Sequence, residues 1–288
     1  MPNPQSKVHP QGPANARPKP HSFRRSLPGR GDSAGPRRLL LALALLLATV
    51  FGPLATASAE DMTAQQILDA MDKNMTFESR TSKLTMTVEA GKRTRVYEIQ
   101  SFGRGESDSA MEYLAPAREK GTRMLKLGDD LWMYLPSVDR VQKISGHMLR
   151  QGMMGSDLSY EDMMASEQME DAYTATVQGS EPVDGRDCWK LEMVAKDDTV
   201  SYPKRVSWID KETYIPLKQE LFALSGMLLK SWTMEKVVEF PGGRKFPTRM
   251  VIQDMIKKDS RTVIEFSDMT FGVELPGEVF SQRWLERK

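Results

Sequence analysis

Residues 119–166 read EKGTRMLKLGDDLWMYLPSVDRVQKISGHMLRQGMMGSDLSYEDMMAS, and this stretch holds the pattern that decides the fold. Two runs of β-forming residues, 123–127 and 131–135, lie on either side of Gly128, Asp129 and Asp130. A short polar link that contains glycine, placed between two apolar runs, is typical of a hairpin turn. The first half of the stretch therefore predicts two antiparallel strands.

The second half, from Gly146 to Ser166, loses the alternation of a strand and is rich in methionine. Its large apolar residues stand among glycines and polar residues: Met148, Leu149, Met153, Met154, Leu158, Met163 and Met164. Methionine is unbranched and polarizable, so this segment suits an apolar surface that adapts to a variable partner. We interpret it as a flap over an apolar cavity. The alternative is that these methionines are ordinary core residues packed over one end of a sheet.

Most of the remaining chain after residue 60 alternates apolar and polar residues between turns that contain glycine, proline or aspartate. The further runs are 84–88, 97–100, 111–113, 174–177, 188–194, 205–210, 216–223, 227–239, 245–255 and 261–266. Strict alternation indicates an antiparallel sheet with one covered face and one solvated face. We expect a mainly β (α+β) fold with about 10–11 strands, and a single sheet of this size has to curl.

Two helices are expected at the ends of this sheet region. Thr63 and Gln66 have the spacing of a capping box, and apolar residues recur at helical spacing from Ile67 to Met75. A short terminal helix fits residues 276–288. The amphipathic first helix must cover part of the sheet, and we expect helices and the Met-rich flap on the concave side of the sheet.

Residues 1–59 differ from the rest of the chain. Residues 1–35 are rich in proline, arginine, serine and glycine, a composition that cannot bury enough apolar surface to fold. Two arginines, a thirteen-residue apolar run at 39–51 and an A-x-A motif ending at Ala59 follow. These features predict a secretory signal peptide cleaved after Ala59, with an apolar run too short to span a membrane comfortably. We therefore expect a disordered leader with signal peptide over 1–59, one domain over 60–288, and a periplasmic location.

The charge and histidine content of residues 60–288 exclude several functional classes. The first 59 residues hold eight of the 40 basic and one of the 39 acidic residues, which leaves the remainder a net charge of −6. This balance argues against non-specific nucleic-acid binding. Only His147 and Cys188 could supply catalytic imidazole or thiol, and transition-metal sites need several such ligands. We expect no cofactor, no metal and no enzymatic activity.

An acidic cluster in the Met-rich segment has a structural explanation. Asp157, Glu161 and Asp162 surround Ser159, and Ser159 and Asp162 have capping-box spacing. Negative charge is also favourable in the first turn of a helix. The cluster therefore predicts a helix start and not a pair of catalytic carboxylates.

The candidate cavity or flap residues are bulky side chains on the expected strands and in the Met-rich segment. They are Leu125, Trp132, Tyr134, Met148, Leu149, Met153, Met154, Met163, Trp208, Phe222 and Trp232. Arg123 and Arg150 are candidates for polar contacts to the flap or to a ligand headgroup. The alternative for both is a solvated arginine whose stem covers apolar neighbours. Periodicity does not tell which strand residues face the concave side.

Residues 121–163, GTRMLKLGDDLWMYLPSVDRVQKISGHMLRQGMMGSDLSYEDM, resemble the outer-membrane lipoprotein-sorting (LolA/LolB-like) superfamily, in its broader LolA-like branch. The resemblance continues through WIDKETYIPLKQE (208–220), FPTRMVIQD (246–254) and FSDMTFGVELPGEVFSQRWLER (266–287). It implies a curled, unclosed antiparallel β-barrel with helices on its concave side and a hydrophobic cavity for lipid acyl chains.

The resemblance also implies a function. It is that of a periplasmic carrier of lipid acyl chains or lipoproteins, which takes its cargo from an inner-membrane exporter and passes it to an outer-membrane receptor. Two alternatives stay open at this point. One is a non-carrying accessory or binding subunit of an RND-type membrane exporter, and the less favoured one is a hydrolase that uses His147.

Overall fold

The computed structural model describes residues 62–165, 169–198 and 200–287. The expected leader and signal peptide lie outside these residues. Among the helices that are described, none is long and apolar enough to cross a membrane.

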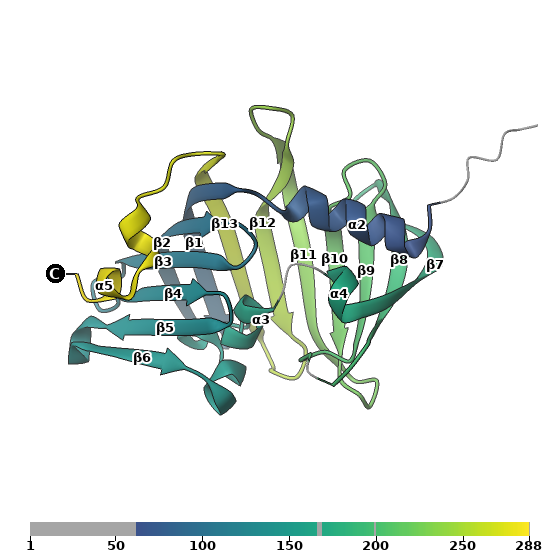
Figure 1. The fold of residues 1–288 in the computed structure, drawn as a ribbon. Coiled ribbons are helices and arrows are strands. Elements are labelled where there is room, and N and C mark those ends of the chain that lie inside the picture. Colours follow the sequence, from purple (N-terminus) through teal and green to yellow (C-terminus); the bar gives the residue numbers. More distant parts are fainter. Residues whose placement is uncertain (1–61, 166–168, 199, 288) are drawn as a thin grey trace, which may run out of the picture. The chain divides into compact units, whose positions relative to one another are not determined.

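Thirteen antiparallel strands form one continuous sheet (Figure 1) in the order β6-β5-β4-β3-β2-β1-β13-β12-β11-β10-β9-β8-β7. Strands β1 and β13, the first and the last in the sequence, pair along their length. The strands are β1 (Ser79–Ala90), β2 (Arg93–Arg104), β3 (Asp108–Ala115), β4 (Arg123–Leu127), β5 (Asp130–Leu135), β6 (Arg140–Ile144), β7 (Tyr173–Val183), β8 (Arg186–Ala195), β9 (Lys204–Asp210), β10 (Pro216–Phe222), β11 (Leu228–Glu239), β12 (Lys245–Asp254) and β13 (Ser260–Phe271).

The two edge strands, β6 and β7, do not pair with each other, so the curled sheet is not closed into a barrel. This confirms the expected fold class. The sheet has more strands than the 10–11 expected, and β6 is one that the sequence pattern missed. Its sequence, RVQKI, is mostly polar, and only Ile144 in it is buried. An edge strand of this kind lacks the apolar alternation that reveals a strand in a sequence.

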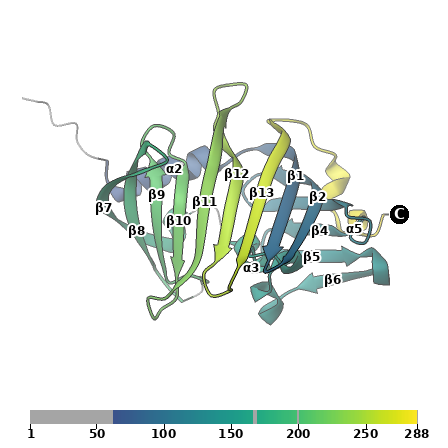
Figure 2. The same cartoon turned by 180° about the vertical axis from the view of Figure 1, so that it is seen from behind.

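Within the described ranges, four α-helices and four 3₁₀ turns accompany the sheet, and α2, α3 and α4 lie on its concave face (Figure 1). From behind, the strands stand in front of these helices (Figure 2). The helical elements are α2 (Ala64–Met75), α3 (Tyr160–Met164), α4 (Met169–Ala172), α5 (Gln282–Leu285), η1 (Pro136–Val138), η2 (Gly146–Arg150), η3 (Met153–Gly155) and η4 (Gly277–Phe280).

Helix α2 begins at the predicted capping box. The Thr63 hydroxyl accepts from the Gln66 backbone N–H at 3.3 Å, and the Gln66 side chain accepts from the Thr63 N–H at 2.8 Å. Ile67, Leu68 and Met71 form the buried stripe of the helix and pack against a cluster on β7, β8 and β9. The cluster residues on these strands are Tyr173, Leu191, Met193 and Ile209.

The Met-rich segment is part of the connection between the two edge strands of the sheet, β6 and β7. The chain leaves β6, passes through η2, η3 and α3 on the concave face, and continues through α4 into β7. Met153 and Tyr160 are buried in the main core cluster with residues of β1, β2 and β5. The Met153 N–H donates to the Leu158 carbonyl at 2.7 Å, which folds the segment back on itself. Gly152 is required here, because a Cβ would lie 2.2 Å from the Ser156 carbonyl oxygen.

Residues 275–287, called here the C-terminal segment, cover the other face of β3, β4 and β5. Phe280, Trp284 and Leu285 pack there against Leu125 and Tyr134. Arg123, whose side chain is 13% exposed, holds the end of the chain. Its Nη1 donates to the carbonyl oxygens of Trp284 at 3.2 Å and Leu285 at 3.3 Å and to that of Arg287, and its Nη2 pairs with Glu112 at 3.0 Å.

We predict that Arg123→Met lowers the free energy of unfolding by roughly 2 kcal/mol, because the part-buried carbonyl oxygens of Trp284 and Leu285 lose a charged donor. Arg123→Lys should recover only part of this, since an ammonium lacks the planar fork of donors. Urea denaturation followed by tryptophan fluorescence measures both. Arg118→Met, at a side chain that is 91% exposed, is the control. Equal stabilities for Arg123→Met and Arg118→Met would contradict the assignment.

Candidate functional site

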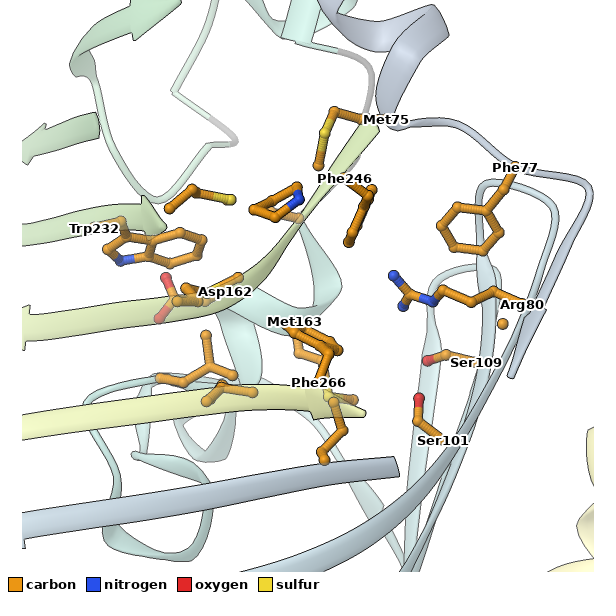
Figure 3. A pocket seen from close by; sticks show the side chains of 18 of the residues that line it. Met75, Phe77, Arg80, Ser101, Ser109, Asp162, Met163, Trp232, Phe246 and Phe266 are labelled. Carbon is orange, nitrogen blue, oxygen red and sulfur yellow. The ribbon is translucent and has the colours of Figure 1, made fainter. Parts of the chain in front are cut away.

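A cavity of about 310 Å³ lies between the concave face of the sheet and the elements that cover it (Figure 3). Helix α2 contributes Met71 and Met75 to its wall, and the Met-rich segment contributes Met153 and Met163. Strands β11, β12 and β13 supply most of the apolar side chains of the sheet side. These are Trp232, Met234, Phe246, Met250, Ile264 and Phe266.

Strand register explains why so many of these side chains point the same way. Met234 is the partner of Met250 across β11 and β12, and Met250 is the partner of Ile264 across β12 and β13. Directly opposed residues in an antiparallel sheet share a face, so the three form one apolar row. Nine methionines line the described cavity in all: Met71, Met75, Met86, Met111, Met153, Met163, Met169, Met234 and Met250. Side chains of this kind repack easily around ligands of different shape.

One side of the cavity carries an arginine held among aromatic rings. The Arg80 guanidinium lies 4.4 Å from the ring centre of Phe77, 5.6 Å from that of Phe246 and 5.9 Å from that of Phe266. Ser101 and Ser109 lie close by in the same view (Figure 3). Cation–π contacts of this kind help to fix the orientation of a guanidinium. The cavity wall is therefore mainly apolar with a cation on one side, and charged residues of both signs also line it: Asp72, Glu106, Asp108, Lys126, Asp162, Arg205 and Arg249.

Asp162 fastens helix α3 to the sheet. Its Oδ2 accepts from the Ser159 N–H at 2.7 Å and forms an ion pair with Lys230 of β11, and its Oδ1 accepts from the Tyr202 hydroxyl at 2.6 Å. The Asp162 side chain is fully buried and that of Lys230 is 12% exposed. The Ser159 hydroxyl accepts from the Asp162 N–H, so the predicted capping box is confirmed. Burial, followed by the adjacent Asp162 charge, raises the pKa of Tyr202 and keeps it a donor.

Asp157 forms a second attachment, to β13. Its backbone N–H donates to the Thr262 hydroxyl at 2.9 Å, and its carboxylate accepts from the same hydroxyl at 3.0 Å and from Ser260. Both buried carboxylates of the acidic cluster are thus used to position the Met-rich segment, as the capping-box interpretation indicates for Asp162.

Asp72, on α2, is a buried carboxyl group that borders the cavity. Its Oδ2 accepts from the Glu170 N–H of α4 at 3.3 Å, while its Oδ1 has no hydrogen-bond partner within the described part of the chain. Burial raises the pKa of Asp72 to about 6. The contact between the two covering helices therefore contains a group that titrates in the mildly acidic range.

The candidate residues from the sequence fall into three groups. Met153, Met163 and Trp232 line the cavity. Met148, Leu149 and Met154 pack against the same core cluster without lining the cavity. The remaining apolar candidates lie on the other face of the sheet: Leu125, Trp132 and Tyr134 under the C-terminal segment, and Trp208 and Phe222 in a separate cluster.

The polar candidates lie away from the cavity. Arg123 contacts the C-terminal segment, as described above, and Arg150 is exposed in η2. His147 is also exposed in η2, and in the described structure no hydrogen bond joins it to a serine, cysteine or carboxylate. Cys188 is buried on the sheet, and burial raises the pKa of its thiol. No group of three or more potential metal ligands occurs among the described residues.

Several cavity residues were missed by the sequence analysis. Phe77 and Arg80 follow the first helix, and Phe246, Met250 and Phe266 lie on predicted strands. The alternation placed the last three on strands, but choosing their face requires the register with β11, which the sequence does not give.

Comparisons with known proteins agree with this architecture. A family model described as "Uncharacterized protein" matches residues 105–287. Among solved structures, a DUF1329 family protein from Desulfovibrio piger is 27% identical with a TM-score of 0.72, and the match covers 77% of this chain and 97% of that chain. A LolA superfamily protein from Nitrosomonas europaea is 28% identical with a TM-score of 0.64, covering 77% and 99%.

The similarity to a third solved structure extends to the fold alone. It is an outer membrane lipoprotein-sorting protein domain from Vibrio parahaemolyticus, 24% identical with a TM-score of 0.70, covering 78% of this chain and 98% of that chain. A search of curated proteins found no match.

The Asp162–Lys230 pair generates a stability prediction. Lys230→Met should cost about 3–5 kcal/mol, because it leaves a buried carboxylate without its counter-charge. The double variant Asp162→Asn, Lys230→Met should be more stable than Lys230→Met alone. Chemical denaturation of the two single variants and the double variant gives the coupling energy. Additive losses would show that the two charges do not depend on each other.

Asp72 generates a pH prediction. Its pKa is higher in the folded protein, at about 6, than the value of about 3.9 in an unfolded chain, so the folded state binds more protons between these values. The contribution of Asp72 to stability is thus greatest below about pH 4 and is lost as the pH rises to about 6. Asp72→Asn should remove this loss. Its stability relative to the wild type should rise between pH 4 and pH 7 in urea titrations, and a difference independent of pH would refute the prediction.

Proposed function

The chain belongs to the LolA-like branch of the outer-membrane lipoprotein-sorting superfamily, and on this premise we propose that it is a non-enzymatic periplasmic carrier of lipid acyl chains or lipoproteins. The observation that carries the proposal is the methionine-lined cavity under the Met-rich segment. Its volume lies at the lower end of the range of ligand pockets, about 300–1,000 Å³. Part of one acyl chain in such a cavity contributes about 0.8 kcal/mol for each buried CH₂ group.

The cavity wall suits a cargo that must be released as well as held. Acyl chains differ in length and unsaturation, and methionine side chains adjust to such differences with small changes in energy. Apolar burial is non-directional, so a bound chain can slide out without breaking a fixed set of hydrogen bonds. No covalent step is needed for this function.

The proposed location and route follow from the leader and the superfamily. Residues 1–59 would direct export and be removed, leaving the lipid-binding domain over 60–288 in the periplasm. An inner-membrane exporter would supply the cargo and an outer-membrane receptor would accept it. The net charge of −6 over residues 60–288 supports partners other than nucleic acid.

Native mass spectrometry with lipid extraction tests the proposal on the protein purified from its own periplasm. A stoichiometric bound lipid or acylated protein is the expected result and identifies the cargo class. A protein that is empty and also takes up no fluorescent fatty acyl probe would refute the carrier function. The alternative of a non-carrying accessory subunit of an RND-type exporter would then be tested by pull-down.

Substitutions at Met250 test whether the fatty acyl probe binds in the cavity. Met250→Asp places a charge in the apolar row of β11 to β13, and we expect it to weaken probe binding about tenfold or more. Met250→Trp should also weaken binding by filling space, without adding charge. Val238→Asp on β11, a 43% exposed residue that does not line the cavity, is the matched control. Equal affinities for Met250→Asp and Val238→Asp would place the probe elsewhere.

A further inference from the structure

Four strongly exposed apolar side chains gather on two neighbouring turns. Leu224 (89% exposed) and Met227 (53%) lie between β10 and β11, and Met255 (50%) and Ile256 (62%) lie between β12 and β13. Both turns are at the same end of the sheet in both views (Figures 1 and 2). They are joined by the Met255 N–H, which donates to the Leu229 carbonyl at 2.8 Å. Exposed apolar residues that cluster in this way mark an interaction site more often than scattered ones do.

Basic side chains continue this surface toward β1 and β2. Lys257 and Lys258 belong to the same β12–β13 turn, and Lys92 and Arg93 lie in the adjacent β1–β2 turn, all of them exposed. The Gly91 N–H donates to the Asp259 carbonyl at 2.8 Å and holds these two turns together. The combined surface, called here the docking tip, comprises Lys92, Arg93, Leu224, Met227, Met255, Ile256, Lys257 and Lys258.

The charge of the docking tip contrasts with that of the domain. Residues 60–288 carry a net charge of −6, yet the tip places four cations beside its apolar side chains. Lys257 is paired with Asp254 at 3.0 Å and with the buried Asp157 at 3.8 Å, so the positive charge of the tip rests mainly on Lys92, Arg93 and Lys258. The other acidic residues in these turns and their flanks are Glu89 and Asp259. Local positive charge next to projecting apolar groups matches an anionic, partly apolar surface.

We propose that the docking tip binds the surface of an anionic lipid bilayer, with the four apolar side chains at headgroup depth and the cations against lipid phosphates. Apolar insertion and attraction to anionic lipids act together in interfacial binding. The tip is also small for a protein partner, because a stable protein interface uses about 20–30 residues on each side.

The docking tip is separate from the cavity, since none of its eight residues lines the cavity wall. The inference therefore does not depend on what the cavity holds. For a carrier, such a tip would bring the protein to the membrane from which lipid is collected or to which it is delivered.

Co-sedimentation with protein-free vesicles tests the inference on the protein purified from the periplasmic fraction. We expect binding to vesicles of equal parts phosphatidylcholine and phosphatidylglycerol, weaker binding to phosphatidylcholine alone, and a decrease with rising salt. Leu224→Asp and Ile256→Asp should each reduce binding about tenfold or more. Lys258→Glu should reduce it about fivefold or more.

Two control variants show whether a loss of vesicle binding is specific to the tip or follows from any added negative charge. Val238→Asp adds the same charge at an exposed valine near the other end of β11, and Arg283→Glu reverses a charge on the exposed side of α5. Both should bind vesicles like the wild type, and acyl-probe binding should be retained in every tip variant. Absence of vesicle binding by the wild type would overturn the inference, as would equal losses in tip and control variants. Binding only to membranes that contain an exporter protein would also overturn it.

Discussion

The sheet is curled but not closed, and the apolar side chains on its concave face must be covered. The rest of the fold depends on this constraint. Strands β6 and β7 are the edges of the sheet, and in the part of the chain that the structure describes no second sheet packs against the apolar residues that point inward. The chain meets this need with α2 and with the segment that runs from β6 to β7 across the concave face. This cover consists of one helix of twelve residues and several short helical pieces, and a cavity of about 310 Å³ is left between it and the sheet.

Two different kinds of interaction hold the cover in place. Methionines supply apolar contact that is large but non-directional, so by themselves they would not define where the segment lies. Asp157 and Asp162 supply direction, through hydrogen bonds to β13 and an ion pair to β11. Buried polar groups of this kind are costly when left unpaired, which restricts the segment to the few positions that satisfy them. The result is an adaptable cavity wall on fixed attachment points.

The two faces of the sheet have different tasks. The concave face forms the cavity, while the C-terminal segment, held by Arg123, covers the opposite face of β3 to β5. Trp208 lies on this other side too, beside Lys190 at 4.9 Å and Lys218 at 4.1 Å from its ring. The docking tip belongs to neither face, since its residues stand on turns at one end of the strands. Substitutions in the cavity and in the docking tip can therefore test the proposed lipid binding and the proposed membrane contact separately.

The sequence by itself determined the fold class, the capping boxes at Thr63 and Ser159, the hairpin around Gly128 and the terminal helix, because these depend on local patterns of a few residues. It did not determine which side of each strand is covered. Alternation with a period of two places Trp132 and Met133 on opposite faces, but either face could have been the concave one. Only the tertiary structure decided that Met133 faces the Met-rich segment and Trp132 the C-terminal segment. The pairing of Asp162 with Lys230, 68 residues away, likewise depends on the path of the chain across the sheet and leaves no local pattern in the sequence.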